Sequence, residues 1–165
     1  MSKLFLKKKI LYFLIVLIIF SADRMSKIYI LSILENLGTV NININSYINF
    51  ILVWNKGVGF GLFSFEQSTI YNLITLIIIL ISLMIIYFII KTKDYRKYFF
   101  LIILGGSLGN LFDRIYYSAV PDFINLHYND FHWFIFNVAD IFVSFGIICL
   151  IFDEIFFNNR KSQND

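Results

Sequence analysis

The chain has 165 residues, of which 59% are hydrophobic and only 15% are charged. Soluble domains carry about 25% charged residues, so this composition excludes an ordinary soluble globular protein. The net charge is +3, and the clustering of the basic residues described below explains it without nucleic-acid binding. The single cysteine, Cys149, excludes an intrachain disulfide and a cysteine-rich zinc site, and we expect it to be a small buried apolar residue.

Four apolar segments follow one another along the chain, at about residues 10–34, 68–90, 98–112 and 131–152. A helix of about 20 apolar residues crosses the roughly 30 Å hydrocarbon core of a bilayer. The second segment contains no charged residue at all. The sequence therefore predicts an all-α membrane protein with four transmembrane helices, forming a single domain over residues 1–165.

The first segment has a second interpretation. Lys7, Lys8 and Lys9 precede an apolar run, as in a cleaved secretory signal. However, the bulky Phe20 stands where such a signal needs a small residue, and apolar sequence resumes after Lys27. We therefore expect a retained helix.

The basic residues predict the orientation of these helices. Ten of the fourteen Lys and Arg residues lie in the N-terminal tail, between the second and third segments, or in the C-terminal tail. They are Lys3, Lys7, Lys8, Lys9, Lys91, Lys93, Arg96, Lys97, Arg160 and Lys161. Four spans would bring all three groups to the same face, which the preference of Lys and Arg for the inner side identifies as cytoplasmic.

The first outer loop, residues 36–66, carries a strand pattern. Val40, Ile42 and Ile44 alternate with asparagines, and residues 47–54 form a second β-prone run before a glycine-rich turn. We expect this loop to form a small extracytoplasmic β-sheet on the outer membrane surface.

Three aspartates interrupt the apolar segments at one depth. At about 1.5 Å per helical residue, Asp23, Asp113 and Asp140 lie roughly 20 Å from the cytoplasmic edge. Inserting each such carboxylate near a helix centre costs about 2.5–3.5 kcal/mol, so three of them at one depth indicate a functional or structural role. Ion pairs of Asp23 with Lys27 and of Asp113 with Arg114 could instead hold the helices together, and both readings stay open.

The remaining candidate chemistry uses carboxylates. No zinc motif or nucleophilic serine motif is present, His127 and His132 are expected in loops, and Ser107 is expected to be a packing residue. Asp122, which follows Pro121 in the outer loop, would on its own be an ordinary loop acid. Two carboxyl groups that share a proton can activate water for hydrolysis. The residues alone leave a membrane aspartic hydrolase and a polar-lined transporter as alternatives.

Five motifs in order resemble those of the lipoprotein signal peptidases (signal peptidase II). They are Asp23-Arg24-Met25-Ser26-Lys27, Asn55-Lys56-Gly57-Val58-Gly59-Phe60-Gly61, the run from Gly105-Gly106 to Asn110 and Asp113-Arg114, Val120-Pro121-Asp122-Phe123, and Phe136-Asn137-Val138-Ala139-Asp140. The resemblance covers nearly the whole chain. Gly59 stands where the family usually has alanine, and Pro121 where it usually has a β-branched residue.

This resemblance implies an aspartic endopeptidase of the bacterial inner membrane, with Asp122 and Asp140 as the catalytic pair. It implies a substrate-binding and supporting set at Asp23, Lys27, Asn55, Gly57, Asn110, Asp113, Arg114, Asn137 and Ala139, with the outer sheet as a cradle over the site. The implied substrates are diacylglyceryl-modified prolipoproteins, cut before the lipid-modified cysteine, and globomycin is the family's inhibitor. We expect no cofactor, metal or nucleic-acid partner, contact with membrane lipids, and a monomer. A proton- or cation-relaying transporter and a non-catalytic assembly factor are the alternatives.

Overall fold

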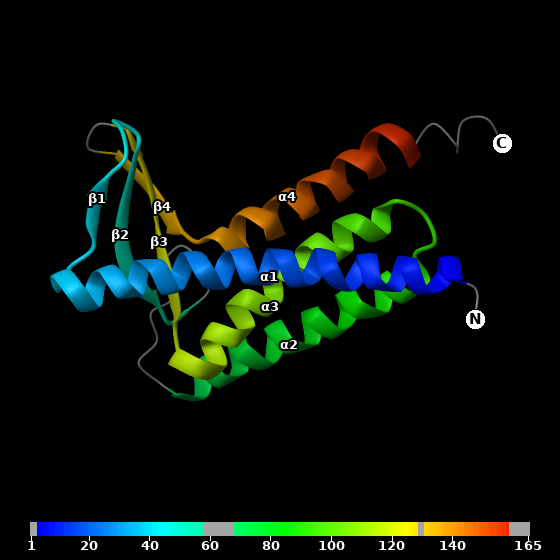
Figure 1. The fold of residues 1–165 in the computed structure, drawn as a ribbon, viewed down its shortest axis with the longest axis horizontal. Coiled ribbons are helices and arrows are strands. Elements are labelled where there is room, and N and C mark those ends of the chain that lie inside the picture. Colours follow the sequence, from blue (N-terminus) through cyan, green and yellow to red (C-terminus); the bar gives the residue numbers. More distant parts are fainter. Residues whose placement is uncertain (1–2, 58–67, 129–130, 159–165) are drawn as a thin grey trace.

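The structure, a computed structural model that describes residues 3–57, 68–128 and 131–158, is mostly helical with one small antiparallel sheet (Figure 1). The helices are α1 (Lys3–Leu37), α2 (Ser68–Lys91), α3 (Arg96–Tyr117) and α4 (Val138–Asp153), which continues into a π-helical segment, Glu154–Asn158. The strands are β1 (Asn41–Asn43), β2 (Ile48–Asn55), β3 (Val120–Tyr128) and β4 (Phe131–Phe136). The glycine-rich turn expected at Gly59 and Gly61, and the basic tail residues Arg160 and Lys161, lie outside the described residues.

Two helices are longer than predicted because their ends have specific backbone stops. The first extends to Leu37, where Gly38 has a φ of +70° and its N–H donates to the carbonyl of Leu34 at 2.8 Å. The third extends to Tyr117 and stops at Ser118, which has a φ of 56°. A left-handed residue directly after a helix reverses the chain direction. The second stop therefore turns the chain out of α3 into β3.

The prediction for the fourth segment was wrong at its start. Residues 131–136 form β4, which pairs with β3 so that Phe131 lies opposite Tyr128 and Phe136 opposite Ile124. Aromatic residues suit a half-buried strand as well as a lipid-facing helix, so apolar composition could not separate the two. Asn137 is extended, with φ −126° and ψ 179°, and the helix begins only after it.

The sheet also differs from the prediction, because only two of its four strands come from the first outer loop. The strand order is β1-β2-β3-β4, with every neighbouring pair antiparallel. Asp122, expected in a loop, lies in β3 opposite Val53, and His127 and His132 also lie on strands. The first strand is short because the Asn45 side chain accepts backbone N–H groups of the following turn at 2.8 and 2.9 Å.

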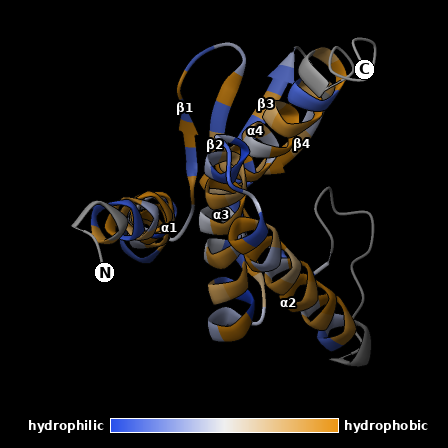
Figure 2. Ribbon diagram, turned by 90° about the vertical axis from the view of Figure 1, so that its right-hand side faces the viewer, coloured by the Kyte–Doolittle hydropathy of each residue, from blue (hydrophilic) through white to orange (hydrophobic). Residues whose placement is uncertain are grey.

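Helix α3 is the centre of the bundle and contacts the other three helices. Figure 2, a view along the bundle, shows α3 between α1 on one side and α2 and α4 on the other. In Figure 1 the sheet lies across one end of the bundle, while α1 begins and α4 ends at the opposite end. The connection from α2 to α3 lies at that same opposite end. The sheet therefore lies at the end of the bundle where α1 and α3 end and α2 and α4 begin.

Burial in this bundle is the reverse of that in a soluble protein. Asp23 and Lys27 are fully buried, whereas Leu73 on α2 is 55% exposed. Two helices, Tyr71–Lys91 and Arg96–Tyr117, are long and apolar enough to cross a membrane, as judged by length and composition. Apolar side chains outside and paired charges inside are stable where the surroundings of the bundle are themselves apolar.

Glycines on α3 let its neighbours approach closely. A Cβ atom on Gly106 would lie 2.6 Å from the carbonyl oxygen of Ala139 in α4. A Cβ atom on Gly109 would lie 2.5 Å from Oδ2 of Asp23 in α1. Both distances are too short for a real contact, so the helix spacing at these two points requires glycine.

We expect Gly106→Ala to destabilise the protein by about 1–3 kcal/mol, the usual result of overpacking. Alanine is a better helix former than glycine by about 1 kcal/mol, so a net loss would isolate the steric clash with Ala139. Chemical unfolding in detergent micelles measures the change, with Ser107→Ala on the same helical turn as control. A Gly106→Ala protein as stable as the parent would contradict the close contact between α3 and α4.

Candidate active site

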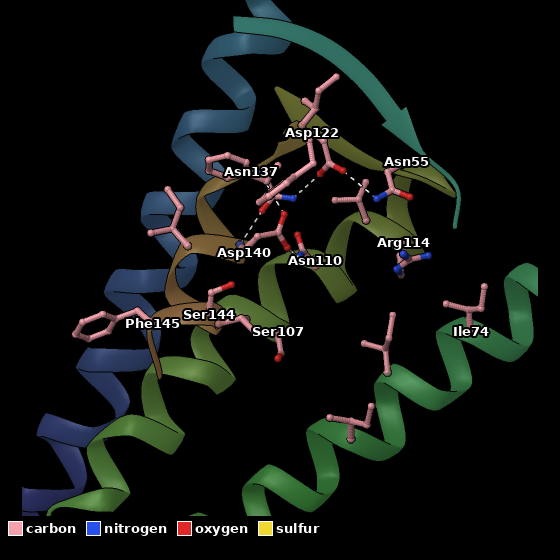
Figure 3. Close-up of a pocket in the computed structure, with 18 of the residues that line it drawn as sticks. Asn55, Ile74, Ser107, Asn110, Arg114, Asp122, Asn137, Asp140, Ser144 and Phe145 are labelled. Atoms are coloured by element: carbon pink, nitrogen blue, oxygen red, sulfur yellow. Dashed lines mark hydrogen bonds between the residues drawn. The ribbon is translucent and has the colours of Figure 1, made fainter. Parts of the chain in front are cut away.

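A cavity of about 780 Å³ lies between α2, α3, α4 and the sheet (Figure 3). One wall is apolar and comes from α2, with Ile74, Ile77, Ile78 and Ile81. The polar side chains that line the cavity are Asn55, Ser107, Asn110, Arg114, Asp122, Asn137, Asp140 and Ser144. Six of these were predicted as site residues, and Ser107 lines the cavity although it was expected only to pack. The α2 wall was not predicted, because an all-apolar helix gives no signal for which face lines a site.

Two carboxylates meet at the polar end of this cavity. Asp122 comes from β3 and Asp140 from the first turn of α4, and both point into the same end in Figure 3. Asn137 contacts both of them. Its side-chain Nδ2 donates to Oδ1 of Asp122 at 2.6 Å, and its backbone N–H donates to Oδ2 of Asp140 at 3.1 Å. The structure therefore brings together the two residues that the sequence placed in separate segments.

The geometry of Asn137 follows from its position as the N-cap of α4. Its Oδ1 accepts the backbone N–H of Asp140 at 3.1 Å, while Asp140 accepts the backbone N–H of Asn137, which completes a capping box. A carboxamide has one accepting end and one donating end. Because the oxygen is used by the helix cap, the NH₂ group is the end that faces Asp122.

Asn55 and Asn110 are oriented in the same way. Oδ1 of Asn55 accepts the backbone N–H of Gly57 at 3.0 Å, and Nδ2 donates to Oδ2 of Asp122 at 2.9 Å. Oδ1 of Asn110 accepts from Nζ of Lys27 at 2.9 Å, and Nδ2 donates to Oδ1 of Asp140 at 2.8 Å. All four carboxylate oxygens of the pair therefore accept an N–H group from an asparagine.

The pKa of Asp122 is raised to about 6. Burial is the largest cause, because it disfavours the charged form, and the neighbouring carboxylate of Asp140 adds repulsion. The hydrogen bonds from Asn55 and Asn137 favour the ionised form and oppose this rise. Asp122 is therefore able to hold or release a proton close to neutral pH.

A buried cluster of four charged side chains, Asp23, Arg24, Lys27 and Asp113, lies beside the carboxylate pair. Lys27 donates to Asp23 at 2.9 Å and to Asp113 at 2.6 Å, and Arg24 lies 2.5 Å from Asp113 and 3.3 Å from Asp23. The open question about Asp113 is thereby answered: its partners are Arg24 and Lys27, and not Arg114. Neither Asp23, Lys27 nor Asp113 lines the cavity. Arg24 was not predicted as a site residue, because its contact with Asp113 depends on the packing of α1 against α3.

The two remaining predicted residues take part through their backbones. Ala139 is fully buried, and its N–H donates to Oδ1 of Asp23 at 3.0 Å. Gly57 is buried, and its carbonyl accepts from Arg114. These contacts tie the start of α4 to α1, and the end of β2 to α3.

Arg114 lines the cavity and has hydrogen-bond donors that no described residue uses. Its Nε and Nη1 atoms are buried and have no hydrogen-bond partner among the described residues. The carbonyl of Arg114 accepts from the hydroxyl of Tyr71 at 2.7 Å, and the guanidinium carbon lies 5.7 Å from the centre of the Tyr71 ring. Tyr71 was not predicted, since a tyrosine at the start of an apolar helix also fits a membrane-interface position.

No group of three or more His, Cys, Asp or Glu residues that could hold a metal ion occurs among residues 3–57, 68–128 and 131–158.

Comparison with known proteins identifies the family. Residues 15–156 match the family described as signal peptidase (SPase) II. The chain belongs to the signal peptidase II family. The lipoprotein signal peptidase of Pelagibacter ubique (strain HTCC1062) is 51% identical over 163 residues, covering 99% of this chain and 98% of the relative. That of Anaplasma phagocytophilum (strain HZ) is 37% identical over 161 residues, covering 96% and 98%.

Solved structures support the same fold. Two bacterial membrane enzymes determined by the in meso method have TM-scores of 0.73 and 0.74 to this chain, at 23% and 22% identity. The first similarity covers 87% of both chains, and the second covers 88% of this chain and 93% of the other. The resemblance drawn from the motifs is thus confirmed. As a member of the signal peptidase II family, the chain is a peptidase, and therefore a hydrolase, and a membrane enzyme. These findings do not favour the transporter interpretation.

We expect Lys27→Met to destabilise the protein by about 3–5 kcal/mol, because among the described residues it leaves the two buried carboxylates with Arg24 as their remaining cation. Chemical unfolding in micelles measures this loss. The double variant Lys27→Met/Asp113→Asn removes one charge of each sign and should recover part of it. A Lys27→Met protein as stable as the parent would show that the cluster does not need this cation.

We expect Asp122 to stay protonated below about pH 6 and to ionise above it, because its pKa is about 6 and not the usual value of about 3.9. Infrared spectra of protein labelled with ¹³C-aspartate should show a protonated-carboxyl band that disappears through this pH. The band should be missing from Asp122→Asn and retained in the control Asp94→Asn, whose side chain is half exposed. A titration midpoint near pH 4 would contradict the assignment.

Proposed function

We propose that the chain is an intramembrane aspartic endopeptidase that removes the signal peptide from diacylglyceryl-modified prolipoproteins. The cut falls before the lipid-modified cysteine, and Asp122 and Asp140 are the catalytic pair. The observation that carries this proposal is the meeting of these two carboxylates, joined by Asn137, at the polar end of a largely apolar cavity. The lipoprotein signal peptidases to which the chain is similar support the substrate class.

The chemistry needs one ionised and one protonated carboxyl group. We assign the acid to Asp122, whose raised pKa allows it to hold a proton, and the base to Asp140; exchanging the two roles gives the same overall reaction. Asp140 takes a proton from water as the water oxygen attacks the scissile carbonyl carbon, and Asp122 gives its proton to the carbonyl oxygen. Collapse of the resulting tetrahedral diol breaks the C–N bond, the leaving nitrogen takes a proton from Asp140, and Asp122 recovers its own from a diol hydroxyl.

The cavity has separate places for the two chemical parts of such a substrate. The unpartnered N–H groups of Arg114, and the second N–H of the Asn55 and Asn110 carboxamides, suit the carbonyl groups of a peptide backbone. The isoleucine wall of α2 suits acyl chains. Both regions of the cavity adjoin the carboxylate pair, so a lipid-anchored peptide would present its scissile bond there.

We further propose four transmembrane helices in the bacterial inner membrane, with both termini cytoplasmic and the active site near the outer face. The beginning of α1, the end of α4 and the α2–α3 connection lie together opposite the sheet (Figure 1). Lys7, Lys91 and Lys97 belong to that end, as the preference for cytoplasmic basic residues requires. The protein would act as a monomer in contact with membrane lipids, without a cofactor.

We expect Asp122→Asn and Asp140→Asn each to reduce cleavage by about 10⁴-fold, because a carboxamide can neither accept nor supply the transferred proton. A diacylated prolipoprotein in detergent is the substrate, and mass determination of the product locates the cut. The control Asp94→Asn changes an aspartate on the connection between α2 and α3 and should keep parental activity. Inhibition by globomycin is a further test.

Full cleavage by either purified site variant would exclude the catalytic pair. Ion flux through the parent in liposomes, without proteolysis, would support a transporter instead.

A further inference from the structure

We infer that Lys27 is a positioning residue for Asp140 that acts through the carboxamide of Asn110. This inference rests on the proposed function, because it assigns Asp140 a catalytic role. It concerns a residue that touches neither Asp140 nor the cavity. Its effect on the reaction is therefore indirect and has to be carried by the groups in between.

The three hydrogens of the Lys27 ammonium group have three acceptors. Nζ lies 2.9 Å from Oδ2 of Asp23, 2.6 Å from Oδ2 of Asp113 and 2.9 Å from Oδ1 of Asn110. The side chain is fully buried. An ammonium group has three donors and no acceptor, so this set satisfies it completely. The two carboxylates hold Lys27 in place, and its third hydrogen is directed at Asn110.

This third hydrogen bond decides which end of the Asn110 carboxamide faces Asp140. With Oδ1 bound to Lys27, Nδ2 donates to Oδ1 of Asp140 at 2.8 Å. If the carboxamide turned over, its NH₂ group would face an ammonium group and its oxygen would face a carboxylate. Both contacts would then be repulsive, and two buried groups would lose their partners.

The other two asparagines of the site do not depend on a distant residue. Asn55 is oriented by the backbone N–H of Gly57, two residues away, and Asn137 by that of Asp140, three residues away. The residue that orients Asn110 lies 83 positions away on another helix. The orientation of Asn110 therefore depends on how α1 packs against α3, whereas that of Asn55 and Asn137 is set within their own segments.

Lys27 also places a positive charge two hydrogen bonds from Asp140. The charged groups of this region are Asp122 from β3 and Arg114 from α3, which line the cavity with Asp140, and the adjoining cluster of Asp23, Arg24 and Lys27 from α1 with Asp113 from α3. Among them, Lys27 is the cation joined to Asp140 through a single carboxamide. Removing it should make ionisation of the carboxylate pair harder, and should shift both limbs of the pH–rate profile to higher pH.

The test uses the charge-balanced variant Lys27→Met/Asp113→Asn, which removes the donor to Asn110 without leaving an unpaired aspartate. We expect kcat per folded enzyme to fall by about 10²-fold with little change in KM, as for a misplaced catalytic group. Both limbs of the pH profile should move upward, because Asn110 is no longer held with its NH₂ group toward Asp140 and the ionised carboxylate loses that hydrogen bond. Arg96→Met, which removes a cation from Asp153 at the opposite end of the bundle, should lower stability without moving the pH profile.

A double-mutant cycle with Asn110→Leu separates this mechanism from a general loss of structure. Asn110→Leu alone should lower kcat and shift the pH profile in the same direction. Because Lys27 acts through Asn110, adding the charge-balanced change should cause almost no further loss of kcat. Additive effects, or an unchanged pH profile in Asn110→Leu, would overturn the inference even if the lysine variant does not fold.

Failure of the positioning role of Lys27 can be distinguished from failure of the proposed function. If the parent does not cleave the diacylated prolipoprotein, or if Asp140→Asn cleaves it fully, the catalytic assignment fails and the positioning role fails with it. If the parent cleaves and Asp140→Asn does not, the cycle alone decides the role of Lys27.

Discussion

The ammonium group of Lys27, held between the carboxylates of Asp23 and Asp113, is the contact on which the rest of the structure depends. Charges surrounded by apolar side chains are stable only when paired, so this contact permits a single register of α1 against α3. Asp23 also accepts the N–H of Ala139 at the start of α4. One buried group thus fixes three helices relative to one another, close to the point where the carboxylate pair forms.

Local backbone requirements then orient the site. A helix start leaves N–H groups without partners, and Asn137 satisfies one of them in α4 with its side-chain oxygen. The same carboxamide is thereby obliged to present its NH₂ group to Asp122. Asn137 thus caps the helix and contacts both carboxylates, so the fold of the helix start also sets the geometry of the pair.

The sheet completes the site because it carries the second carboxylate to the end of the bundle. β3 follows α3 directly, and β2 holds it in register through the pairing of Val53 with Asp122. On the other side, α2 lines the cavity with four isoleucines, Ile74, Ile77, Ile78 and Ile81, which cannot compete for the carboxylates. A polar end beside an apolar wall is the arrangement that a lipid-linked peptide requires.

The sequence by itself determined the membrane class, the positions of the helices and, through its motifs, the family and most of the polar residues in the cavity. It could not assign residues 131–136, since aromatic runs suit strands and lipid-facing helices equally. It could not decide whether Asp113 pairs with Arg114 or with Arg24 and Lys27, because adjacency along the chain says nothing about which helix packs alongside. Only the tertiary structure brought Asp122 and Asp140 together, since pairing between distant segments depends on packing and on burial of charge and leaves no periodic trace in the chain.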